Sequence, residues 1–212
     1  AVKSSVVRPS FSGSIAESAE ELYAVYPYNA NATLADGKIT TTIPHEQVVP
    51  EGGNVDKSAL LCVAKTTSDA LAFKNVLGLV KVTVPGNMKI ARITLRGKDN
   101  ETLAGTGTIE VTDTPKFDAT EAATSITLTY ADNGVFPAGE YYLAVAPVEF
   151  KNGFTISFTK VDAKTALKEA TKSNTVARNG GLDTKNLLTA LSLVCEIYNK
   201  TDLLNWGANW GR

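Results

Sequence analysis

The chain has 212 residues, of which 43% are hydrophobic and 20% are charged, so it is long enough to bury a substantial core. Its 21 basic and 22 acidic side chains give a net charge of -1 and are spread along the chain. This balance gives no electrostatic footprint for nucleic acid or for an anionic membrane surface, so a nucleic-acid-binding function is not expected. No run of about 20 apolar residues is present, so no transmembrane segment is expected.

Residues 1–70 are expected to form a partial β-sandwich. Apolar and β-branched residues predict strands at 22–26, 37–43 and 59–65, with a loop at 51–54. A complete sandwich needs more strands than these three. The others are therefore either missing or supplied by another chain.

Residues 71–180 predict a fuller β-sandwich. Apolar side chains recur at every second position, opposite polar ones, in four runs of ordinary strand length, at 80–84, 91–95, 126–130 and 154–158. Turn sequences rich in Gly, Asn and Pro separate these runs. No amphipathic helix of about 10–15 residues lies between successive strands, so an all-β fold is predicted rather than a parallel α/β sheet.

Residues 181–212 are expected to form a helical extension or to begin a further module. From Asp183, which could cap a helix together with Thr184, the apolar residues follow helical spacing: Leu187, Leu188, Leu191, Val194, Cys195 and Tyr198. A second short helix is expected after Thr201, with Trp206 and Trp210 on one face. Two interpretations stay open, a helix packed on the sandwich and the start of another domain.

The residues that could support catalysis do not form a recognisable motif. The only histidine, His45, lies in a polar segment after a predicted strand, where a surface position is the usual outcome. Glu17, Glu20 and Glu21 occur in a hydrophilic stretch, and the glycines at 105 and 107 lack the strand-loop-helix context of a phosphate loop. We therefore predict that the chain is not an enzyme and has no catalytic, cofactor-binding or metal-binding residues.

The two cysteines, Cys62 and Cys195, both lie in apolar segments. They are too few for a structural zinc site, which needs four Cys or His ligands at close spacing. Two interpretations stay open, one long-range disulfide and two buried free thiols, and the apolar surroundings favour the thiols.

Exposed aromatic side chains would indicate a sugar-binding module. The candidates are Tyr23, Tyr26, Tyr28, Tyr141, Tyr142, Trp206 and Trp210. Most aromatic residues follow the alternating pattern, which favours core positions. Because these aromatic residues are available, a secreted glycan-binding β-sandwich module is kept as the alternative function.

Several segments, taken in order, resemble the fimbrillin-like surface proteins of Gram-negative gut and oral anaerobes. They are the sequences YAVYPY at 23–28, IPHEQ at 43–47, LAFKNVLGLVKV at 71–82, ITL and LAG at 93–95 and 103–105, and FKNGFTI at 150–156. The similarity extends over about residues 10–180, and it lies in the order and spacing of these segments rather than in any single motif.

The resemblance implies two tandem transthyretin-like β-sandwich domains, of which the first is incomplete here. It also implies a structural or adhesive subunit of a fimbria (pilus), displayed at the cell surface and outer membrane as a secreted lipoprotein. Its partners would be other fimbrial subunits, joined by strand addition, and a surface receptor or glycan. Membrane attachment would depend on a lipidated N-terminus that is removed or absent.

The chain departs from the family pattern at both ends. Only about twenty residues precede the YPY segment, which indicates either removal of an upstream portion or a compact variant. Because the chain opens at Ala1, a processed or trimmed form is expected, with Lys3 or Arg8 as candidate cleavage positions. The expected helical tail does not match an extended donor strand, which favours a tip or accessory subunit over a stalk pilin.

Overall fold

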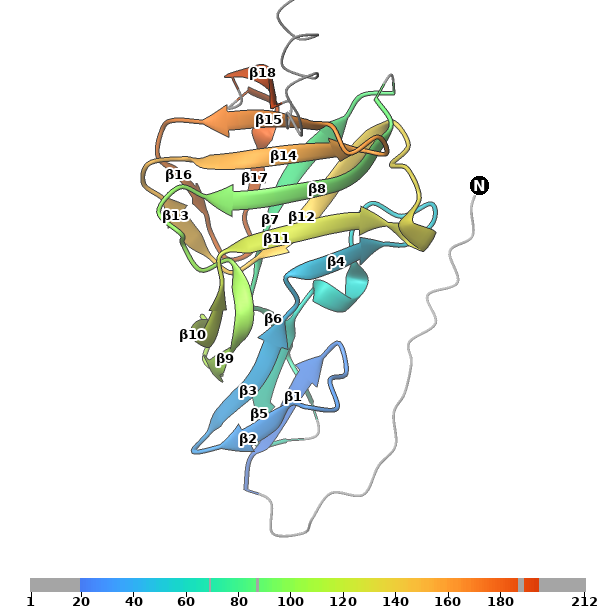
Figure 1. Cartoon of the computed structure of the whole chain (residues 1–212). Helices are drawn as coiled ribbons and strands as arrows, with labels where there is room; N and C mark the ends of the chain where they lie inside the picture. The colour runs from blue at the N-terminus through green and yellow to red at the C-terminus, as the bar shows by residue number, and fades with distance from the viewer. Residues whose placement is uncertain (1–19, 69, 87, 187–188, 195–212) are drawn as a thin grey trace, which may run out of the picture.

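The computed structural model describes residues 20–68, 70–86, 88–186 and 189–194 of the chain. Within these ranges the regular structure consists of strands β1 to β18 and three short 3-10 helices, so the fold is all-β as predicted. Figure 1 shows two lobes: a larger lobe formed by β4, β7, β8 and β11 to β18, and a smaller lobe formed by β1 to β3, β5, β6, β9 and β10.

The larger lobe contains a six-stranded sheet, a three-stranded sheet and a two-stranded ribbon. In the six-stranded sheet the order is β18 (Thr189–Val194), β15 (Thr165–Ala170), β14 (Phe154–Lys160), β8 (Ile90–Gly97), β11 (Ser125–Tyr130) and β4 (Glu46–Val49). The three-stranded sheet has the order β12 (Gly139–Val145), β7 (Gly78–Val84) and β17 (Gly181–Asp183). The ribbon pairs β13 (Val148–Phe150) with β16 (Asn174–Val176).

The smaller lobe contains one sheet of three strands and one of four. The first has the order β1 (Leu22–Tyr26), β5 (Cys62–Thr66) and β6 (Lys74–Asn75). The second has the order β10 (Lys116–Ala123), β9 (Ala104–Glu110), β3 (Lys38–Ile43) and β2 (Thr33–Ala35). Both sheets contribute side chains to the same apolar core as the larger lobe.

Period-two alternation accounts for the core, because successive side chains of a strand point to opposite faces. In β7 the valines at 80, 82 and 84 are buried, whereas Lys81 and Thr83 reach the surface. The same alternation buries the apolar residues of β8, β11 and β14, including Ile93, Leu95, Ile126, Leu128, Phe154 and Ile156. Every run for which the sequence predicted this pattern is a strand.

The β9–β10 hairpin lies between β8 and β11 in the sequence but extends into the smaller lobe (Figure 1). Burial alternates along β9 but not along β10, most of whose residues are exposed. Gly105 explains part of the geometry of the hairpin. Gly105 has φ +119, and a Cβ at this position would collide with the backbone oxygen of Glu121, beside the bulge between Ala119 and Glu121. Only glycine fits such a close approach of two backbones.

Strand pairs join segments on both sides of residue 70. Strand β3 pairs with β9 in the smaller lobe, and β4 pairs in parallel with β11 in the larger lobe. The division into domains at 1–70 and 71–180 stays a prediction. The pairs show that each lobe contains residues from both of these segments.

The predicted helix at 183–198 is wrong over its described part. Thr184–Asn186 is a single 3-10 turn, and Thr189–Val194 is strand β18, antiparallel to β15. The sequence TALSLV at 189–194 fits a period of two as well as the helical period, so pattern alone cannot decide. This segment forms a strand because it can pair with the edge of β15, and such tertiary context outweighs local propensity. Asp183 does act as a cap, but of the 3-10 turn rather than of a longer helix: its carboxylate accepts the N–H of Lys185 at 3.0 Å.

Candidate functional site

A shallow groove lies between β1 and β2 at the open side of the smaller lobe. Its volume is about 150 Å³, and its lining residues are Tyr23, Ala24, Val25, Ala32, Thr33, Leu34 and Ile39. Ile39 is buried, Tyr23 and Val25 are half-buried, and the Leu34 side chain is 52% exposed. Apolar side chains therefore line a surface that is open to solvent.

The two strands beside the groove are edge strands. Strand β1 pairs only with β5, and β2 pairs only with β3, among the residues that the structure describes. In an antiparallel pair every second residue directs its N–H and C=O away from the partner strand. The groove thus combines apolar side chains with backbone groups that can pair with an added strand.

An exposed aromatic pair lies at the end of β1. The rings of Tyr26 and Phe73 meet edge to face, with centroids 6.4 Å apart and planes at 72°. Tyr26 is 59% exposed and Phe73 46%, and the neighbouring Tyr28 is also exposed. Because the two rings are steeply inclined, they do not form one flat platform on which a sugar ring could stack.

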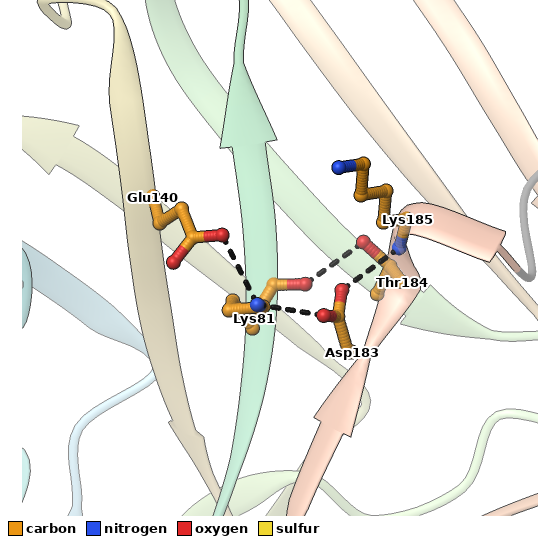
Figure 2. Close-up of polar contacts among 5 residues, drawn as sticks. All are labelled: Lys81, Glu140, Asp183, Thr184 and Lys185. Atoms are coloured by element: carbon orange, nitrogen blue, oxygen red, sulfur yellow. Dashed lines mark hydrogen bonds and ion pairs between the residues drawn. The ribbon is translucent and has the colours of Figure 1, made fainter.

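A second cluster of polar side chains lies on the outer face of the three-stranded sheet. Figure 2 shows the Lys81 amine between two carboxylates, those of Glu140 on β12 and Asp183 on β17. The distances from Lys81 Nζ are 3.1 Å to Glu140 Oε1 and 2.6 Å to Asp183 Oδ2. Thr184 adds a hydrogen bond from its hydroxyl to the backbone oxygen of Lys81, at 2.8 Å.

The charges in this cluster stabilise one another. Hydrogen bonds to Asp183 and Glu140 raise the pKa of Lys81, and the hydrogen bond from Lys81 lowers the pKa of Asp183. Both shifts favour the ionised forms. A protonated amine is not a nucleophile, so the cluster acts as an ion-pair clamp that holds β17 against β7.

The residues considered for catalysis lie apart. His45 is exposed between β3 and β4, and residues 105 and 107 belong to strand β9 rather than to a loop. Glu21 is paired with Lys65 at 2.7 Å on the surface, while Glu20 is exposed and Glu17 lies outside the described residues. Within the described ranges no group of three or more His, Cys, Asp and Glu side chains could hold a metal ion.

Cys62 is a free, half-buried thiol at the start of β5, and its burial raises the pKa. Cys195 lies outside the described residues, as do Trp206 and Trp210. No helix in the described part of the chain is both long and apolar enough to cross a bilayer.

The aromatic residues divide between core and surface. Tyr141 is buried, and its hydroxyl donates to the backbone oxygen of Pro137 at 2.9 Å; burial raises its pKa. Tyr23 and Tyr142 are half-buried, whereas Tyr26 and Tyr28 are exposed. The prediction that most aromatics enter the core therefore fails for the YPY segment at 26–28.

Sequence reasoning missed both the groove and the Lys81 cluster as sites. The alternation of Tyr23 and Val25 was visible, but nothing in the sequence indicated that β1 and β2 would line one groove. The sequence predicts Asp183 as a helix cap and gives no sign that it lies beside β7. Comparisons with known proteins add nothing to these assignments, because no family model, curated protein or solved structure matched the chain.

Proposed function

We propose that the chain is a structural and adhesive subunit of a bacterial surface fimbria and that it assembles by strand addition between subunits. The supporting observation is the apolar groove between the edge strands β1 and β2. An added strand would pair its backbone with an edge and insert alternate side chains between Tyr23, Val25 and Leu34. Two tandem transthyretin-like domains and surface display belong to the same proposal. A tip or accessory position stays part of it without the argument from a helical tail, because Thr189–Val194 is strand β18.

A second candidate is a secreted glycan-binding module. Its support is the exposure of Tyr26, Tyr28 and Phe73, since aromatic side chains on a surface commonly mark binding sites. The inclined Tyr26 and Phe73 rings weaken this alternative, because together they offer no flat stacking surface.

The assembly proposal is tested by placing a charge in the groove. The purified chain, with and without limited trypsin treatment, is examined by light scattering and negative-stain electron microscopy for multimers. We expect Leu34→Arg to abolish multimers, because an arginine in the groove excludes an apolar donor side chain. The matched control is Val161→Arg, which changes a similarly exposed residue beyond β14 in the larger lobe.

Two results would contradict the proposal. A wild-type chain that stays monomeric at high concentration under both treatments does not assemble by strand addition. Multimers that tolerate Leu34→Arg and Val161→Arg equally well do not use the groove.

A further inference from the structure

The outer face of the six-stranded sheet is a regular array of hydroxyl groups. In register across the strands, Thr94 of β8 lies opposite Thr127 of β11 on one side and Ser157 of β14 on the other. The neighbouring rows add Ser125, Thr129, Thr155, Thr159 and Thr165. Side chains in one row are about 5 Å apart, and successive rows along a strand are about 7 Å apart.

Two arginines stand in the middle of this array. Arg92 and Arg96 occupy the same face of β8, and four residues of a strand place them about 13 Å apart. Both are exposed. Within the described part of the chain the Arg92 side chain has no hydrogen bond or ion pair, and the Arg96 side chain donates only to the amide oxygen of Asn100, at 2.7 Å.

Among the residues that the structure describes, no carboxylate forms an ion pair with either guanidinium group. Glu169, at one end, is paired with Lys98. Glu46 is two strands away from β8, beside Thr127 on β4. The array defined by Arg92, Arg96 and the Thr and Ser residues named above is called the hydroxyl-arginine face. It has a positive centre, although the chain as a whole carries a net charge of -1.

The hydroxyls retain capacity for a ligand. Thr94 and Thr127 share one hydrogen bond at 3.4 Å, and Thr159 and Thr165 share another at 3.3 Å. Each hydroxyl has one donor and two acceptor lone pairs, so a bonded pair of hydroxyls still has a donor and several acceptor positions to offer.

We propose that the hydroxyl-arginine face binds an acidic polysaccharide, whose carboxylates pair with Arg92 and Arg96 and whose sugar hydroxyls bind the threonines. Guanidinium groups bind carboxylates through two parallel hydrogen bonds. Two apolar residues of β4 and β15 lie on this face, the half-exposed Val48 beside Thr129 and the half-buried Leu167 beside Ser157. Three strands separate them, so they form no continuous apolar patch of the kind found in the core of a protein interface. Two arginines are too few for the many phosphate contacts of a nucleic acid.

This inference goes beyond fibre assembly and does not depend on it. The hydroxyl-arginine face belongs to the larger lobe, whereas the groove lies between strands of the smaller lobe. A monomer that cannot assemble through Leu34 should therefore still bind the polysaccharide. Failure of one proposal would leave the other standing.

The test is affinity electrophoresis of the whole chain in native gels that contain either sodium alginate, a polyuronate, or neutral dextran. We expect retardation by alginate alone, and weaker retardation as salt is raised, because the pairing is ionic. The double variant R92Q/R96Q should bind alginate at least ~10-fold more weakly, since it lacks both charge-assisted donors. The variant T94V/T127V, which keeps side-chain shape but removes hydroxyls, should also bind more weakly.

The matched control is K38Q/K57Q, which removes two positive charges from exposed lysines of the other lobe and its connecting loop. It should bind alginate as the wild type does. Absence of retardation in the wild type would overturn the proposal. An equal loss in K38Q/K57Q and R92Q/R96Q would also overturn it, because net charge rather than this face would then explain the binding. Circular dichroism checks that every variant keeps the β-fold.

Discussion

The two lobes differ at the edges of their sheets: hydrogen bonds connect the edge strands in the larger lobe, whereas a groove separates them in the smaller lobe. In the larger lobe, side chain and loop atoms bridge β4 to β12: the Gln47 amide bonds both backbone groups of Ala144, at 2.8 and 3.0 Å, and Tyr142 N–H donates to Asn54 at 2.9 Å. In the smaller lobe, the corresponding gap between β1 and β2 is the open groove. One apolar core therefore extends through both lobes. The larger lobe is closed by hydrogen bonds, which suits stability, and the smaller lobe has an open groove, which suits binding.

The largest expected effect is a loss of stability when the core of the larger, closed lobe is disrupted. Phe154 of β14 is fully buried against Phe150, with ring centroids 5.0 Å apart. Phe154→Ala should lower the free energy of unfolding by about 4 kcal/mol, because it removes apolar contacts and leaves a cavity. Val25→Ala, at the half-buried edge of the groove, should cost only about 1 kcal/mol. Urea unfolding of both variants measures the difference, and equal losses would show that the lobes do not differ as described.

The second prediction concerns the bridge itself. Gln47 is fully buried, and Gln47→Leu would leave the N–H and C=O of Ala144 without their partner. We expect a loss of about 3 kcal/mol in the free energy of unfolding, since each buried polar group left unpaired is costly. Thr129→Val is the control, because its hydroxyl makes only a long 3.5 Å contact to the Gln47 backbone. If the Gln47→Leu chain were as stable as the wild type, the Gln47 hydrogen bonds would not contribute to the difference between the two lobes.

The sequence predicted the strands whose pattern reflects one buried face. Strands β7, β8, β11 and β14 lie in the middle of sheets, where alternation records burial directly. Strand β12 was missed because Leu143, Ala144 and Val145 are all buried, which removes the alternation. Strand β10 was missed for the opposite reason, since most of its residues are exposed.

The sites depend on contacts between distant segments, which pattern does not record. Lys81 and Asp183 meet because β17 returns to pair in parallel with β7, a register set by the fold. The groove similarly depends on β1 and β2 belonging to two different sheets. A period of two predicts which face of a strand is wet, but it does not predict which wet or edge positions become neighbours.

The smallest expected effect concerns the ion-pair clamp that fixes β17 to the closed lobe. Because the pKa of Asp183 is lowered in the folded state, its ionised form stabilises the fold above about pH 4, the ordinary range of a free aspartate. This contribution is lost as the pH falls through the lower, folded-state value. Lys81, whose pKa is raised, stays charged throughout this range.

Asp183→Asn should therefore lower the melting temperature slightly at pH 7, and the difference from the wild type should shrink below about pH 4. Thermal unfolding followed by circular dichroism from pH 3 to pH 7 measures it. Asp132→Asn is the control, because Asp132 has positive φ, which asparagine tolerates, and no ion pair among the described residues. A difference between wild type and Asp183→Asn that persists unchanged at pH 3 would mean that the carboxylate charge does not hold β17.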